Sequence, residues 1–341
     1  MCCGPGGVGK TTVAAAMAVE GAYSGRRVVV VTIDPARRLA DALGLDSLTN
    51  TPKRVEGDWP GELWALMLDP RATFDGLVAR YAPDPDQAET ILANRFYRNI
   101  AGALSGTQEY MAMEKLYELH GDERFDLVVV DTPPTRNALD FVDAPRRLTR
   151  FLDNRLFRLL MLPARTGLRA VNVATHAFLR TVGKVVGSEV VSDAVTFFQA
   201  FEGMEDGFRQ RAARVQELLA EPATAFVLVA SPRRDATRET EFFAEKLNEA
   251  GIAVQALVVN RMHPRFSPMP APPAAGVGAG TTLATLFRNM AELSRMADGE
   301  EAHVASLAAR LAAPAVRVPE LETDVHDLTG LSRVAAYVFA G

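Results

Sequence analysis

A glycine-rich segment near the start of the chain has the spacing that binds phosphate. Residues Gly4–Thr11, GPGGVGKT, satisfy the pattern G-x-x-x-x-G-K-[ST] in full. Glycines let the backbone turn tightly, so that consecutive N–H groups point inward at a β-phosphate. The helix that follows adds its positive N-terminal end, the lysine reaches the β- and γ-phosphates, and the threonine hydroxyl ligates Mg²⁺. We therefore predict an MgATP site that is contacted by Gly6, Gly7, Val8, Gly9, Lys10, Thr11 and Thr12.

A loop of this kind needs a carboxylate near the magnesium ion, and two predicted strands end in one. Asp34 follows the apolar run Val28–Ile33, and Asp131 follows Leu127–Val130. Ligands gather at the carboxyl ends of the strands in an open parallel sheet, so both acids should face the nucleotide. We predict that Asp131 belongs to the magnesium site and that Asp34 orients the attacking water. The alternative for each residue is that it caps the following helix.

These residues need a buried parallel sheet, and the chain alternates between strand and helix patterns accordingly. Apolar and β-branched runs, typical of strands buried on both faces, predict strands at 28–33, 63–67, 127–130, 225–230, 254–260 and 315–318. Helices are predicted at 12–23, within 71–120 with a break at 83–85, and at 239–250. The alternation predicts an α/β fold with a mostly parallel, doubly wound P-loop NTPase sheet. Since only three residues precede the loop, we expect most of its leading strand to be missing from this sequence.

Composition narrows the class of protein. The chain has 341 residues, 48% hydrophobic and 23% charged, with a formal net charge of -5, which argues against bulk affinity for nucleic acid. Its two cysteines, Cys2 and Cys3, are adjacent, so they provide neither a disulfide framework nor a CxxC metal motif, and a reducing, cytoplasmic compartment fits them best. No run of 18 apolar residues predicts a membrane span.

We predict one ATPase domain over 1–341, with a helical insertion at 143–222 and a flexible Pro/Gly/Ala-rich loop at 267–280. The insertion contains two groups of large apolar residues, and the second has helical spacing with one apolar face. Its members are Phe197, Phe198, Phe201, Met204 and Phe208.

Three segments, in order, resemble the nucleotide motifs of the ArsA family of arsenite-pump ATPases and ATPases that deliver tail-anchored membrane proteins. They are the glycine-rich loop, Thr32–Asp41 and Asp131–Thr135. The resemblance implies that Asp34 is the switch I aspartate that positions water and that Asp131 begins switch II and reaches Mg²⁺ through water. It also implies that Asn260 holds the adenine, for which a turn-forming strand terminus is the alternative, and that Pro319 lines the same pocket.

Three departures from the family pattern matter. Pro5 stands where members carry a second lysine that reaches the partner subunit's phosphates, and a proline offers neither a charge nor an N–H. Arg136-Asn137-Ala138 replaces the usual Gly-His-Thr of switch II. The cysteines build neither an arsenite thiol site nor a zinc site between subunits. From Pro5 we hypothesise that catalysis is completed by a related subunit or by an arginine, with Arg37 and Arg136 as candidates.

The resemblance implies a nucleotide-switched dimer, formed with a second copy or a related subunit, and three functions stay open. The first is a targeting ATPase that handles a hydrophobic membrane-protein client, for which the insertion would form a groove. Packing of its apolar faces on the ATPase core and against a second subunit is the favoured alternative to a groove. The second is the energising subunit of an oxyanion pump, and the third is a weakly hydrolysing regulatory subunit.

Overall fold

The computed structural model describes residues 1–34, 37–100, 107–133, 143–144, 146–147, 149–150, 153, 188–200, 204–265 and 282–340. Within these ranges the chain forms two compact units. Unit 1 combines residues 1–67, 124–139 and 224–341, and unit 2 combines 68–123 and 140–223. About half of the predicted insertion at 143–222 lies outside the described residues, and the predicted loop at 267–280 lies wholly outside them, so the division into one domain with an insertion stays a prediction.

Unit 1 contains an eight-stranded sheet with the order β3-β4-β2-β5-β1-β6-β7-β8. Every neighbouring pair is parallel except β3 with β4. The predicted α/β fold with a mostly parallel sheet is therefore confirmed. The strands are β1 (Cys2–Cys3), β2 (Arg27–Thr32), β3 (Lys53–Val55), β4 (Glu62–Met67), β5 (Leu127–Asp131), β6 (Phe226–Ala230), β7 (Val254–Met262) and β8 (Ala315–Pro319).

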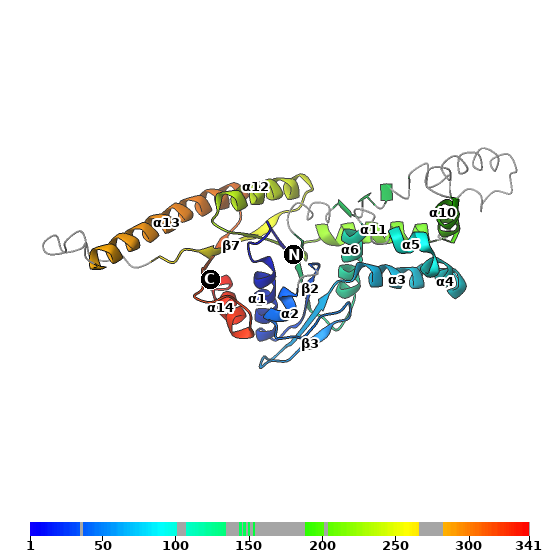
Figure 1. Cartoon of the computed structure of the whole chain (residues 1–341), viewed down its shortest axis with the longest axis horizontal. Helices are drawn as coiled ribbons and strands as arrows, with labels where there is room; N and C mark the ends of the chain where they lie inside the picture. Colours follow the sequence, from blue (N-terminus) through cyan, green and yellow to red (C-terminus); the bar gives the residue numbers. More distant parts are fainter. Residues whose placement is uncertain are drawn as a thin grey trace. The chain divides into compact units, whose positions relative to one another are not determined.

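Helices lie on both faces of this sheet (Figure 1). On one face, α1 (Lys10–Tyr23), α2 (Arg38–Ala42) and α14 (Leu328–Val338) pack on alternate strand residues such as Val28 and Val30 in one continuous core. On the other face lie α12 (Arg234–Glu249) and α13 (Thr282–Leu311). Because β2 is buried on both faces, it reads as an unbroken valine run, the pattern from which the strand was predicted.

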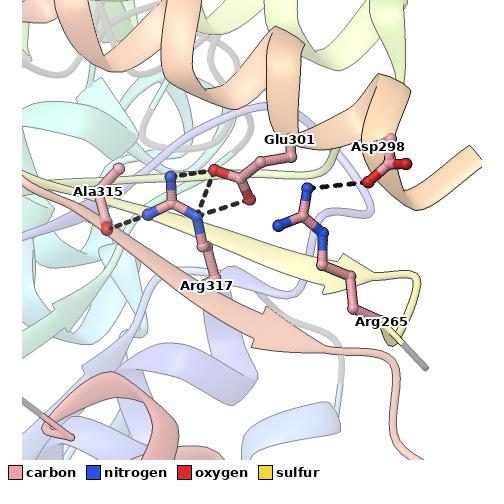
Figure 2. A network of polar contacts seen from close by, with 5 residues as sticks. All are labelled: Arg265, Asp298, Glu301, Ala315 and Arg317. Atoms are coloured by element: carbon pink, nitrogen blue, oxygen red, sulfur yellow. Dashed lines mark hydrogen bonds and ion pairs between the residues drawn. The ribbon is translucent and has the colours of Figure 1, made fainter. Parts of the chain in front are cut away.

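Ion pairs tie the C-terminal half of α13 to the edge of the sheet (Figure 2). The Nε group of Arg317, on β8, lies 2.9 Å from both carboxylate oxygens of Glu301, and its Nη1 donates to the Ala315 carbonyl at 2.9 Å. Arg265, just after β7, pairs with Asp298 at 3.0 Å. These contacts place α13 beside β7 and β8, whose carboxyl ends border the site described below.

Unit 2 is helical in the residues that the structure describes. Its aromatic core includes Tyr97, Phe197 and Phe208, which are almost fully buried, and Met204 lies among them. Phe197, Met204 and Phe208 of the predicted apolar face therefore pack inside unit 2. The side chains of Phe198 and Phe201 lie outside the described residues, so packing of the face on the ATPase core and against a second subunit stays a prediction. The helices are α3 (Pro70–Tyr81), α4 (Pro85–Ala93), α5 (Arg95–Ile100), α6 (Thr107–His120), α10 (Ser188–Ala200) and α11 (Glu205–Ala220).

Two predicted boundaries need correction. The strand expected to end at Asn260 continues to Met262 through an irregularity in its pairing with β8, where Arg261 has a φ of 62°. The helix expected to begin at Glu239 begins at Arg234, because it starts almost directly after β6 with a polar first turn that has no apolar periodicity. No helix within the described ranges combines the length and apolar character needed to cross a membrane.

Candidate nucleotide site

The glycine-rich loop joins the central strand β1 to the first turn of α1, and close packing fixes its shape. Gly9, the residue before the helix, has a φ of 93°. A Cβ atom at this position would lie 2.2 Å from the Nδ2 atom of Asn260. At Gly4, a Cβ atom would lie 2.0 Å from the carbonyl oxygen of Val229, on β6. Close contacts with β6 at Gly4 and with β7 at Gly9 therefore favour glycine at both positions, independently of any ligand.

Lys10 begins α1, and its side chain folds back over the loop. The Nζ group donates to the Pro5 carbonyl at 2.8 Å, and the residue is buried. Burial lowers the pKa of the ammonium group, and the nearby Asp131 carboxylate opposes that effect. The helix continues through Thr11 and Thr12, which line the same cavity as Lys10. The loop thus holds one positive charge at the N-terminal end of a helix, where a phosphate group would bind.

Asp131, the last residue of β5, meets Thr11 directly. The hydroxyls of Thr11 and Thr32 donate to the same carboxylate oxygen, Oδ2, at 2.7 Å and 3.0 Å. The other oxygen, Oδ1, is buried and has no hydrogen-bond partner. Burial raises the pKa of this carboxyl to about 6, although the two hydroxyls and Lys10 oppose the shift. A buried, unpartnered carboxylate oxygen is expensive unless a further donor or a cation satisfies it.

This donor set fits a magnesium ion. A threonine hydroxyl and a carboxylate are hard oxygen ligands, and Mg²⁺ is commonly held by one or two such groups together with waters and substrate phosphates. Among the residues that the structure describes, no group of three or more His, Cys, Asp or Glu side chains forms a metal cage. Thr11 and Asp131 would therefore share the ion with a bound triphosphate, and the ion would supply charge neutralisation for the phosphates.

Asp34 lies at the end of the neighbouring strand, β2, and lines the same cavity as Lys10 and Asp131. Its backbone N–H donates to the Thr32 hydroxyl at 3.3 Å, and the N–H of Ile33 donates to the Asp131 carbonyl at 3.2 Å. The hydroxyl of Thr32 therefore contacts both acidic segments, since it also donates to Asp131. The structure brings the two predicted aspartates together at one edge of the sheet.

Asn260 lies at the other side of the loop. Its Nδ2 group donates to the Val8 carbonyl at 2.9 Å, and its Oδ1 accepts from the N–H of Arg261 at 3.0 Å. One amide N–H and one oxygen lone pair are not used by these two bonds. Asn260 and Pro319 both line the cavity with the loop. The side chain of Asn260 thus braces the loop and also borders the space where the resemblance places the base.

These residues enclose one cavity of about 690 Å³, within the usual size range of small-molecule sites. Two arginines in its lining were not selected from the sequence. Arg38 extends from the first turn of α2, and Arg261 reaches back so that its Nη1 donates to the Gly7 carbonyl at 3.3 Å. Arg37, a sequence candidate for catalysis, is exposed and does not line the cavity, and Arg136 lies outside the described residues.

The cysteines do not contribute chemistry to the site. Cys2 and Cys3 form β1, between β5 and β6, and both thiols are free and buried. Burial raises the pKa of Cys2 to about 12 and also raises that of Cys3, so neither thiol ionises readily. The carbonyl of Cys2 accepts from the Thr132 hydroxyl at 2.9 Å, which fixes the segment after Asp131.

Comparison with known proteins identifies the family. The model of a family described as anion-transporting ATPase matches residues 1–268. The chain is 28% identical to the ATPase ARSA2 of Chlamydomonas reinhardtii over 263 residues, 76% of this chain and 66% of that protein, just under two thirds of its length. It is 25% identical to the ATPase GET3 of Malassezia globosa over 261 residues, and 26% identical to the ATPase asna-1 of Caenorhabditis elegans over 270. These matches cover 76% of this chain in both cases, and 71% and 72% of the two relatives.

The resemblance seen in the three nucleotide motifs is confirmed by these matches. The family model spans the glycine-rich loop, both aspartates and Asn260. The fold brings both aspartates, Asn260 and the loop residues Gly7, Gly9, Lys10 and Thr11 to one cavity, whereas Gly6 and Val8, also predicted to contact the nucleotide, do not line it. The chain therefore belongs to the anion-transporting ATPase family, whose ArsA- and GET3-type members are P-loop ATPases.

Proposed function

We propose that this cavity binds MgATP and that the protein hydrolyses it. The observation that supports this most directly is the group formed by Lys10, Thr11 and Asp131, which places an ammonium group, a hydroxyl and a buried, unsatisfied carboxylate oxygen at the start of one helix. The ammonium group and the loop N–H groups would bind the β- and γ-phosphates, and the two oxygen ligands would hold Mg²⁺. Asn260 and Pro319 would border the adenine.

The proposed reaction is in-line attack of water on the γ-phosphorus. A bond forms between the water oxygen and phosphorus, the bond to the β-phosphate oxygen breaks, and ADP, inorganic phosphate and a proton are released. Asp34 would orient the water, since its carboxylate belongs to a cavity-lining residue at the end of β2. Lys10 would stabilise the negative charge that is shared by the transferred phosphoryl group and the leaving oxygen.

Nucleotide state would be transmitted through Thr32. Its hydroxyl contacts the Asp131 carboxylate and the Asp34 backbone, so a displacement of either acid changes the hydrogen bonding of the other. A γ-phosphate that orders the segments after β2 and β5, and is lost on hydrolysis, would act as a switch of the kind seen in other P-loop proteins.

We further propose that the active form is a dimer with a second copy or a related subunit, in the cytoplasm, where the free thiols of Cys2 and Cys3 stay reduced. Family resemblance supports a second subunit. A hydrophobic membrane-protein client remains a candidate for the output. Burial of Phe197, Met204 and Phe208 inside unit 2 removes those three side chains from any client-binding groove.

Isothermal titration calorimetry tests the binding step. Wild-type protein should bind MgATP with an affinity at least about 100-fold above that of the Lys10→Ala variant, because the only ammonium group of the loop is lost. Lys53→Ala is the matched control, since Lys53 is exposed on β3 and does not line the cavity. Absence of binding by the folded wild type, or equal binding by Lys10→Ala, would overturn the proposal. Light scattering with and without a non-hydrolysable ATP analogue tests the dimer.

A further inference from the structure

The part of the cavity near Lys10, which we call the phosphate end, combines several acidic side chains with few basic ones. Asp34, Asp41 and Asp131 line it, whereas the loop supplies a single ammonium group from Lys10. MgATP adds further negative charge, which grows on the leaving oxygens during hydrolysis. Pro5 has neither a side-chain charge nor an N–H with which to compensate. A second cation within this chain would relieve the imbalance.

Arg38 is placed to provide it. The residue begins α2, and the cavity lining takes Arg38, Asp41 and Ala42 from this helix, the i, i+3, i+4 spacing of one helical face. The intervening Leu39 and Ala40 are buried in the core of unit 1, so the orientation of the helix is fixed. The Arg38 face is thereby directed at the cavity.

The guanidinium group of Arg38 is exposed, and no hydrogen bond or ion pair links it to another residue of the described part of the chain. Its positive charge nevertheless repels that of Lys10, and this repulsion contributes to lowering the pKa of the Lys10 ammonium group. Lys10 and Arg38 therefore act on the same region of the cavity from two different helices, and Arg261, the other arginine of the lining, donates to the Gly7 carbonyl of the loop.

We infer that Arg38 contacts the γ-phosphate of bound ATP and supplies, from within the same chain, the second positive charge that the loop lacks at Pro5. This inference rests on the proposed function. A planar guanidinium group donates two parallel hydrogen bonds to phosphate oxygens, which suits a terminal phosphate with three exposed oxygens. Since α2 follows the Asp34 segment, loss of the γ-phosphate would release α2 together with that segment. Arg37, its neighbour in sequence, is not part of the cavity lining.

Calorimetry with two nucleotides tests the inference. For Arg38→Ala, binding of the magnesium complex of a non-hydrolysable ATP analogue should weaken at least about 10-fold, whereas binding of MgADP should change less than about 2-fold, because only the γ-phosphate contact is lost. Arg38→Lys should lie between, since the charge remains without the paired donors. Arg54→Ala, an exposed arginine on β3 away from the cavity, should match wild type with both nucleotides.

The outcomes separate this inference from the proposed function. If the folded wild type binds neither nucleotide, the proposed function fails. If it binds both, and Arg38→Ala weakens the two equally or leaves the ATP analogue unaffected, the role of Arg38 is refuted while the nucleotide site stands. Circular dichroism of each variant establishes that the fold is retained. The turnover number for ATP hydrolysis should fall by about 1,000-fold or more in Arg38→Ala, because an arginine that stabilises phosphoryl transfer contributes about 10³- to 10⁵-fold.

Discussion

Replacement of Gly9 by alanine tests whether packing against Asn260 shapes the phosphate loop. The new Cβ atom would lie 2.2 Å from Nδ2 of Asn260, so the amide must move away from the Val8 carbonyl that it bonds at 2.9 Å. A side chain at a φ of 93° costs about 1 kcal/mol or slightly more, and a lost buried hydrogen bond costs about 1 kcal/mol further, or more if the amide is left unsatisfied. We expect Gly9→Ala to lower the free energy of unfolding by about 2–3 kcal/mol.

Gly25→Ala is the matched control. Gly25 has a φ of 79°, and nothing lies within 4 Å of a Cβ atom placed there, so only the backbone cost of about 1 kcal/mol applies. Urea unfolding followed by tryptophan fluorescence measures both, since the only two tryptophans, Trp59 and Trp64, belong to unit 1. In an Asn260→Ala background the cost of Gly9→Ala should fall to that of Gly25→Ala. Equal costs for the two glycine variants in the wild-type background would refute the reasoning.

Three further predictions concern charged groups. Hydrogen bonds from Arg27 lower the pKa of Asp126 to about 2. The carboxylate therefore stabilises the fold above its unfolded pKa of about 3.9, and this contribution is lost as pH falls towards 2. In urea titrations, the excess free energy of unfolding of wild type over Asp126→Asn should shrink between about pH 5 and about pH 3. Burial raises the pKa of Glu114, although hydrogen bonds from Tyr110 and Arg211 oppose the shift, so ionisation of its carboxyl costs more in the folded protein than in the unfolded one. As pH rises above about 4.3, the free energy of unfolding of wild type should therefore fall relative to that of Glu114→Gln, and no change in the difference would contradict this. Arg317→Ala removes the contacts to Glu301, so amide hydrogen exchange in the C-terminal half of α13 should accelerate, while the affinity for MgATP should not fall. Unchanged exchange would show that the ion pair does not anchor the helix.

Much of the sheet was predictable because its strands are buried on both faces. Val28–Ile33 and Leu127–Val130 form unbroken apolar runs, and their observed bounds, Arg27–Thr32 and Leu127–Asp131, differ by one residue at most at each end. The edge strand Lys53–Val55 was missed, since two of its three residues are charged and exposed. Helix α13 was also missed, because its 30 residues mix polar, charged and small side chains, and only Ala297, Val304 and Leu307 are buried.

The chemistry of the site was predictable where it depends on local order along the chain. A complete phosphate-loop pattern, and acids placed directly after buried strands, identify Lys10, Thr11, Asp34 and Asp131 as neighbours, and the structure places all four in one cavity. Arg261 was not predictable, because its φ of 62° and its contact with Gly7 arise from an irregular pairing of β7 with β8. No local pattern distinguishes such an arginine from one on a solvated surface.

The order of the strands places different groups at the two ends of the cavity. Along β2-β5-β1-β6-β7-β8, the Asp34 segment follows β2, Asp131 ends β5 and the phosphate loop follows β1, so the groups suited to phosphate and magnesium occupy one side. Asn260 on β7 and Pro319 on β8 occupy the other side. A nucleotide bound across this edge would therefore lie with its γ-phosphate towards α2 and its base towards β8. This orientation separates two kinds of selectivity: contacts near α2 would distinguish ATP from ADP, and contacts near β8 would distinguish one base from another. Because Asn260 also braces the loop through Val8, the two ends of the cavity remain mechanically connected.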